Sequence, residues 1–216
     1  MRVVSISRFH LRCRASSVTI REIKAMANTG LAFLAYFYFD FKDKAKQDLR
    51  ALLSSLLVQL SDQSDTFCDA LSSLYLAHSR GSEQPTTGSL AECLKSMLTT
   101  AGQMRMYFVI DAIDECPNDL GIPSSREKVL KLVKELVGLR RPNLRLCITS
   151  SPEFDIRTAL ESLATQQVSL HDESGQKQDI FDYVTAVIHS DQKMKRWRDD
   201  VKDMVIQKLT EKADGM

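Results

Sequence analysis

The chain has 216 residues, of which 44% are hydrophobic and 26% are charged, so it can form a globular domain with a buried core. Its 29 basic and 28 acidic residues nearly cancel, which leaves no overall positive field to hold a nucleic-acid backbone. No apolar run approaches the roughly 20 residues that a membrane-spanning helix requires, so we expect neither nucleic acid nor a membrane as a partner.

The N-terminal segment is compositionally unusual, because the first 24 residues contain six basic residues and a single acid, Glu22. An Arg-rich, acid-poor start is compatible with a mitochondrial presequence, but this one lacks a clear apolar face. We therefore favour a divergent N-terminus over residues 1–16. Residues 3–6 predict a short strand, and the apolar spacing over 17–27 predicts a helix.

Strong apolar patterns follow in the first half of the chain. Residues 31–41 (LAFLAYFYFDF) are aromatic or aliphatic except for Asp40 and predict a buried strand. Leucines then recur at helical spacing from 49 to 60 and predict a helix that covers the sheet. A second helix is predicted over about 64–78. After a loop, Ser89 and Glu92 have the spacing of a capping box at the start of a third helix.

The second half of the chain continues the alternation of strands and helices. We predict strands over 106–110, 144–149 and 167–170, and helices over 124–137, 156–163 and from 179 onward. The first of these helices begins with a capping box formed by Ser124 and Glu127. Strands that alternate with amphipathic helices predict an α/β fold, with helices on both faces of a parallel sheet.

The spacing of the glycines and of the cysteines argues against several common nucleotide-binding and metal-binding motifs. The two closest of the eight glycines, Gly81 and Gly88, are seven residues apart. A Walker A loop needs two glycines five apart before Lys-Ser/Thr, and a dinucleotide fingerprint needs three within six residues, so the chain contains neither. The five scattered cysteines form no Cys-x-x-Cys pair, which disfavours a disulfide framework and structural zinc. We expect a reducing, cytoplasmic location.

An acidic segment directly follows the predicted strand at 106–110. Asp111, Asp114 and Glu115 complete the pattern of an apolar strand followed by D-x-x-D-E. Ligands of parallel sheets gather at the carboxyl ends of strands, where Asp111 could hold Mg²⁺ directly or through water. Asp114 and Glu115 could orient or deprotonate a water near a γ-phosphate. The alternative is a solvated acidic loop or a helix N-cap, but the spacing favours the nucleotide-related interpretation.

Longer segments resemble NACHT-type NTPases of the STAND group, in the fungal form similar to a nephrocystin-like N-terminal domain. The segments that carry the resemblance are AYFYFDFKD at 35–43, LRALLSSLLVQL at 49–60, YFVIDAIDEC at 107–116, LRLCITSSPEFDI at 144–156 and KADGM at 212–216. The resemblance implies a P-loop fold with strand order 5-1-4-3-2 over residues 17–175. It also implies Mg²⁺ with ATP or GTP, and a switch or scaffold role in recognition or cell death.

The resemblance assigns roles to residues and also exposes departures. It places Asp111 at the metal and gives Asp114 and Glu115 the catalytic role. Ser151 stands where the family has an arginine that senses the γ-phosphate. The family's Gly-Lys-Ser/Thr lies just upstream of Ser16, where this chain has Arg-Phe-His-Leu-Arg-Cys-Arg at 8–14.

The two ends of the chain give further expectations. We expect residues 2–7 to replace the family's first strand, between the strands at 144–149 and 167–170, because a central gap would leave backbone groups unpaired. Residues 176–216 resemble the start of a helical subdomain that is cut within an element. In relatives, ankyrin or other repeats follow.

Three functions remain open. We favour an interaction or regulatory module without ATPase activity, which binds protein partners or self-associates through the NACHT-like core. The second is a weak nucleotide binder that retains Mg²⁺ through Asp111. The third is a working NTPase with an unrecognised phosphate loop, for which Arg12, Arg14, Ser16 and Ser17 would be the residues to test. Independently of nucleotide, we expect the acidic segment to survive as a weak divalent-ion site.

Overall fold

The computed structural model describes the whole chain except residues 1, 8–11, 170–174, 192 and 214–216. It consists of two compact units, Met1–Val168 and Ser169–Met216. The first contains the sheet and its covering helices, and the second is helical. Within the described part of the chain, no helix is both long and apolar enough to cross a membrane.

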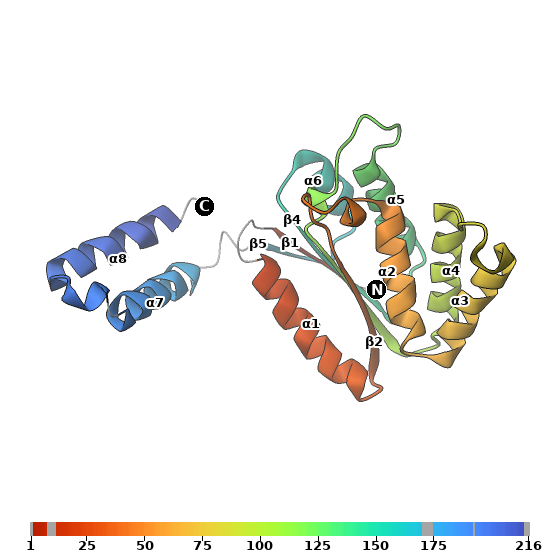
Figure 1. The fold of residues 1–216 in the computed structure, drawn as a ribbon, viewed down its shortest axis with the longest axis horizontal. Helices are drawn as coiled ribbons and strands as arrows, with labels where there is room; N and C mark the ends of the chain where they lie inside the picture. The colour runs from red at the N-terminus through yellow and green to blue at the C-terminus, as the bar shows by residue number, and fades with distance from the viewer. Residues whose placement is uncertain (1, 8–11, 170–174, 192, 214–216) are drawn as a thin grey trace. The chain divides into compact units, whose positions relative to one another are not determined.

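The first unit is built on a five-stranded sheet in the order β2-β3-β4-β1-β5 (Figure 1). The strands are β1 (Arg2–Ser7), β2 (Ala32–Tyr38), β3 (Arg105–Asp111), β4 (Leu144–Ser150) and β5 (Gln166–Ser169). The pairs β2–β3, β3–β4 and β1–β4 are parallel. Read from the other edge, this order is 5-1-4-3-2, so the predicted fold class is confirmed.

β1 lies between β4 and β5, as we expected of residues 2–7. Its register with β4 runs without interruption from Arg2 opposite Arg145 to Ser7 opposite Ser150. The backbone of this short segment therefore supplies hydrogen-bonding groups that β4 would otherwise lack on that side. The divergent N-terminus completes the centre of the sheet.

One face of the sheet is covered by several helices (Figure 1). They are α2 (Leu49–Ser61), α3 (Asp65–Ala77), α4 (Thr87–Thr100), α5 (Ser125–Gly138) and α6 (Phe154–Leu160). The leucine stripe of α2 is buried as its spacing predicts, with Leu52, Leu56 and Leu60 each at 0% exposure. These helices and the inner face of the sheet share one large apolar core.

α1 (Arg12–Asn28) covers the opposite face (Figure 1). Its residues Ile20 and Ile23 pack with Leu34 of β2 and Val109 of β3 in a second, smaller apolar cluster. The helix begins five residues before the predicted start at Ser17, because Arg and Ala in this stretch are good helix formers. It therefore crosses the boundary that we drew at residue 16.

The second unit is a pair of helices, α7 (Gly175–Ser190) and α8 (Asp199–Ala213), joined through a short 3-10 turn at Met194–Arg196. Ile188 of α7 and Ile206 of α8 are its buried aliphatic residues among those described. The expected helical segment is thus present, and the predicted boundary between residues 175 and 176 falls at the start of α7.

Candidate functional site

Asp111 ends β3 and is the buried centre of the candidate site, with 2% exposure. Its Oδ1 atom accepts a 2.5 Å hydrogen bond from the hydroxyl of Ser16, in α1. The same oxygen accepts a hydrogen bond from the hydroxyl of Thr149, at the end of β4. Because the parallel strands β3 and β4 end at the same edge of the sheet, three elements that are far apart in sequence meet at one carboxylate.

Ala112 turns the chain away from this carboxylate. It has left-handed backbone angles (φ 57°, ψ 49°), which are uncommon for a residue with a side chain. Its N–H donates to Thr149 Oγ1 at 2.9 Å, so the hydroxyl of Thr149 links the turn to Asp111. The short helix η3 (Ile113–Glu115) begins directly after the turn.

The other two predicted acids contact other loops. Asp114 Oδ2 accepts a 2.7 Å hydrogen bond from the hydroxyl of Ser151, just after β4. Glu115 Oε2 accepts a 3.2 Å hydrogen bond from the N–H of Phe41, in the loop after β2. Within the described ranges, no group of three His, Cys, Asp or Glu side chains could hold a metal ion. The expected three-carboxylate cation site is therefore not assembled.

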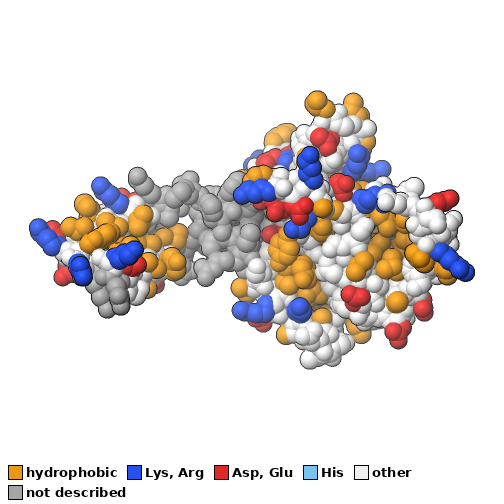
Figure 2. All heavy atoms as spheres, viewed as in Figure 1, with side chains coloured by type: hydrophobic (Ala, Val, Ile, Leu, Met, Phe, Trp, Pro, Cys, Tyr) orange, Lys and Arg blue, Asp and Glu red, His pale blue; other side chains and the backbone are white. Residues whose placement is uncertain are grey.

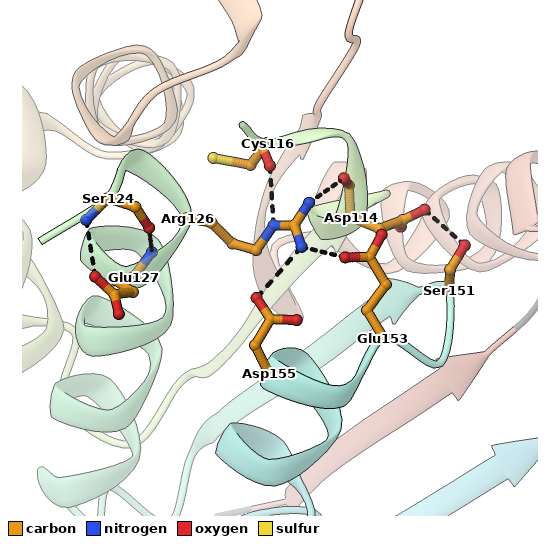
Figure 3. A network of polar contacts seen from close by, with 8 residues as sticks. All are labelled: Asp114, Cys116, Ser124, Arg126, Glu127, Ser151, Glu153 and Asp155. Atoms are coloured by element: carbon orange, nitrogen blue, oxygen red, sulfur yellow. Dashed lines mark hydrogen bonds and ion pairs between the residues drawn. The ribbon is translucent and has the colours of Figure 1, made fainter. Parts of the chain in front are cut away.

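Arg126, in the first turn of α5, is the residue that the sequence analysis missed (Figure 3). It is 6% exposed, and its Nε and Nη2 atoms donate to the carbonyls of Cys116 (2.9 Å) and Asp114 (2.7 Å). Its Nη1 donates to Glu153 and, at 3.3 Å, to Asp155. Burial alone would lower the pKa of Arg126, but Glu153 and then Asp155 raise it.

Arg126 ties the acidic loop to the segment that follows β4. Glu153 and Asp155 lie at the beginning of α6, a few residues after Ser151. The ion pairs of Arg126 and the Ser151–Asp114 hydrogen bond therefore join the same two segments at two points (Figure 3). The helix dipole disfavours a cation in the first turn of a helix. An arginine between the two capping-box residues of a predicted helix was therefore the sign in the sequence that could have identified Arg126.

The nearby thiols are chemically inert. Burial, with a smaller effect of Asp111, raises the pKa of Cys147 to about 11. Burial also raises the pKa of Cys116 to about 12, and its Sγ donates to the carbonyl of Gln47 at 3.2 Å. Since the thiolate is the nucleophile, neither group is a candidate for covalent chemistry at neutral pH.

A known protein family matches the region of the chain that contains this site. The family described as "Nephrocystin 3, N-terminal" matches residues 14–151, more than half of the chain. The chain belongs to this family. The matched region contains Ser16, the whole acidic segment and Ser151. No curated protein sequence matched the chain.

One solved structure supports the fold of this nephrocystin-type domain. The Aeropyrum pernix ORC2 protein, solved in ADPNP and ADP complexes, is similar with a TM-score of 0.51 and 14% identity. The similarity covers 86% of this chain and 45% of that one, so the chain spans less than half of the ORC2 protein. Drosophila ORC bound to poly(dA/dT) DNA and Cdc6 has a TM-score of 0.45 at 11% identity, over 88% of this chain and 32% of that one. The first similarity shows that this chain shares its fold with part of the ORC2 protein.

The sequence between β1 and α1 differs from that of a Walker A loop, and its residues 8–11 lie outside the described residues. β1 ends at Ser7 and α1 begins at Arg12, which leaves four positions, Arg-Phe-His-Leu, with neither glycine nor lysine. Glycine lets backbone amides close on a phosphate, and lysine supplies the positive charge. The donor set beside them fits a divalent ion better, because Asp111 and the Ser16 hydroxyl are oxygen ligands.

Proposed function

We propose that this domain is an NTPase-like module that acts as a cytoplasmic scaffold or signalling component and does not hydrolyse nucleotides. This proposal rests on the sequence of the four-residue connection between β1 and α1, which contains neither glycine nor lysine. Without them, the β- and γ-phosphates have no cradle at the place where a P-loop fold binds them.

The acidic loop supports the same proposal. Asp114 accepts a hydrogen bond from Ser151, and Glu115 accepts one from the N–H of Phe41. Ser151 lies where the resemblance puts the γ-phosphate-sensing arginine, and a hydroxyl cannot replace that charge. A positioned cation on the γ-phosphate contributes roughly 10³–10⁵ in rate, so its loss together with that of the lysine removes useful turnover.

A second candidate function is nucleotide binding with Mg²⁺ and without hydrolysis. The observation that favours it is the hydrogen bond between Ser16 and Asp111, because a Ser/Thr hydroxyl and an aspartate hold Mg²⁺ in P-loop NTPases. In this chain the same two residues would hold the ion. Bound Mg²⁺ would supply charge neutralisation for phosphate oxygens.

Titration of the full chain with fluorescent ATP and GTP, with and without Mg²⁺, tests both candidates. We expect no turnover and no Mg²⁺-independent binding. Hydrolysis that Glu115→Gln abolishes would overturn the proposal. An increase in melting temperature with Mg²⁺ that is lost in Asp111→Asn would support the ion site. Identical melting curves for the wild type and Asp111→Asn would rule the ion site out. If nucleotide binds, loss of binding in Ser16→Ala would assign the contact to this hydroxyl. Unchanged binding would make Arg12 and Arg14 the next residues to replace.

A further inference from the structure

The segment between the acidic loop and α5 is an ordered protrusion with an apolar tip. We call residues 117–124 the finger. Leu120 and Ile122 in it are each 101% exposed, whereas no other large hydrophobic side chain in the described part of the chain exceeds 82%. Figure 2 shows hydrophobic side chains at the end of the protrusion that Figure 1 places before α5. Neither side chain contributes to the core, so folding does not explain them.

The finger is held in shape by hydrogen bonds at its base. The carboxylate of Asp119 accepts from the N–H of Gly121 (3.0 Å), and from the N–H (3.3 Å) and hydroxyl (2.5 Å) of Ser125. A Cβ at Gly121 would lie 2.9 Å from that carboxylate, so a larger residue there would displace the Asp119 side chain from these hydrogen bonds. The N–H of Arg126 donates to the carbonyl of Pro117 at 3.0 Å and closes the loop. The two aliphatic side chains are therefore presented on a built turn.

A hollow of about 430 Å³ adjoins the finger, between α4 and α5 near the start of α2. Its apolar lining includes Leu49, Ala91 and Leu132, and Pro123 of the finger forms part of its wall. The full exposure of Leu120 and Ile122 shows that they do not fill this hollow in their own chain. An apolar projection and an apolar recess thus lie side by side on one surface.

The charges around the finger and the hollow are complementary. Asp119 is the only charged residue of the finger, and Lys128 and Lys131 line the hollow. No ion pair within 4 Å involves either lysine in the described ranges. Lys95, on the opposite wall, is already paired with Glu92 and Glu135, each at 2.9 Å. The charge of Lys128 already acts on Asp119 of its own finger. A second finger that enters the hollow would bring its carboxylate toward one further ammonium group, that of Lys131.

We propose that two copies of this chain associate by a two-fold exchange, in which each finger inserts Leu120 and Ile122 into its partner's hollow. A two-fold axis needs one self-complementary surface, and the adjacent finger and hollow provide it. The interface is small, so we expect a transient dimer with a dissociation constant of roughly 1–100 μM. This inference rests on the proposed scaffold function and names its partner as a second copy of the chain.

Sedimentation velocity of the full chain between about 5 and 500 μM tests the dimer. We expect concentration-dependent dimerisation of the wild type. The double variant Leu120→Ser/Ile122→Ser should weaken it about 10⁴-fold, since the exchange buries four of these side chains, two from each copy, and each contributes about tenfold. Ala91→Arg, which fills the hollow from α4, should also abolish it. Leu76→Ser is the matched control, because Leu76 is 59% exposed on α3 and lies outside the finger and hollow. It should dimerise like the wild type.

Mixing the two defective variants gives the sharpest result. The finger variant retains an intact hollow and Ala91→Arg retains an intact finger, so an equimolar mixture should form a heterodimer with one of the two insertions. A monomeric wild type, an unaffected finger variant, or a mixture that associates no more strongly than either variant alone would overturn the dimer. Dependence on Leu120 and Ile122 for binding phosphatidylserine vesicles by a monomeric wild type would assign the finger to a lipid surface instead. ATP turnover in the same samples would contradict the proposed function without affecting the dimer.

Discussion

Arg126 is the residue on which two loops of the candidate site depend. It donates to two backbone carbonyls of the acidic loop and to two carboxylates near the start of α6. All these groups would lose a partner if the guanidinium were removed. The carbonyls of Asp114 and Cys116 would then lie beside an apolar replacement that offers them no donor.

Arg126→Met should therefore lower the free energy of unfolding by about 1–3 kcal/mol, because the carbonyls of Asp114 and Cys116 lose their donor. The Glu153 side chain is 44% exposed, so Glu153→Gln, which keeps an acceptor, should cost less than about 1 kcal/mol. Urea unfolding of the two variants measures both values. Equal stability of Arg126→Met and the wild type would show that the network contributes nothing to the fold.

Thr149 links the end of β4 to both Asp111 and the strained turn at Ala112. It is fully buried, so its hydroxyl cannot be replaced by bulk water. We expect Thr149→Val to destabilise the fold by about 1–3 kcal/mol, because the N–H of Ala112 would be left unsatisfied. Thr149→Ser retains the hydroxyl and should recover most of the loss. If the two variants melt at the same temperature, the hydroxyl is not what stabilises the turn.

At the scale of elements, the last turn of α2 and the residues just after it protect the open edge of the sheet. The amide of Gln63 accepts from the N–H of Leu34 (2.9 Å) and donates to its carbonyl (2.6 Å). Gln59 does the same for Tyr36, at 3.0 and 2.7 Å. β2 is an edge strand, and these two side chains occupy the backbone groups that could otherwise pair with a strand of another molecule.

The double variant Gln59→Met/Gln63→Met tests this protection. It removes the four hydrogen bonds to the edge strand, and two more to Ser55 and to the carbonyl of residue 59. Because the site is partly solvated, we expect a loss of about 1–2 kcal/mol in unfolding free energy together with concentration-dependent aggregation. Gln103→Met adds a similar apolar surface outside the edge of β2 and is the control. Light scattering after incubation distinguishes the two. Aggregation of both variants to the same extent would attribute it to surface hydrophobicity alone.

The sequence predicted elements best where one local signal dominates. The capping box of Ser124 and Glu127 is present at the start of α5, as expected. The one predicted at Ser89 is wrong, because Thr86 caps α4 and accepts from the N–H of Ser89 at 3.1 Å, so the helix starts a turn earlier. Both residues are good N-caps, and local sequence cannot choose between them.

At the scale of the whole molecule, the strand order was predictable from the resemblance and the candidate site only in part. Asp111 was identified because it directly follows an apolar strand. Its contacts with Ser16 and Thr149 join residues separated by 95 and 38 positions, and such contacts depend on the register of the sheet. Asp114 and Glu115 contact different loops because the chain turns at Ala112 with left-handed backbone angles. An alanine in the sequence does not predict such a turn.

The central position of β1 gives the last prediction. Val4 lies opposite Cys147 in the middle of β1, and β1 has β4 on one side and β5 on the other. Proline at this position has no N–H to donate, and proline is confined to edge strands and bulges for that reason. We expect Val4→Pro to lower the free energy of unfolding by about 1–3 kcal/mol for each backbone group left unpaired, and to unfold the domain if several are lost.

Val4→Thr is the matched control, because threonine keeps the N–H and is also β-branched, so it should retain the backbone pairing and melt well above Val4→Pro. Circular dichroism melts of the two variants decide the result. If Val4→Pro and Val4→Thr melt together, residues 2–7 do not supply the central strand. Because β1 also leads directly into the connection before α1, a loss of its pairing would displace Ser16 from Asp111. Any Mg²⁺-dependent stabilisation should then disappear in Val4→Pro and persist in Val4→Thr, which links the integrity of the sheet to the candidate ion site.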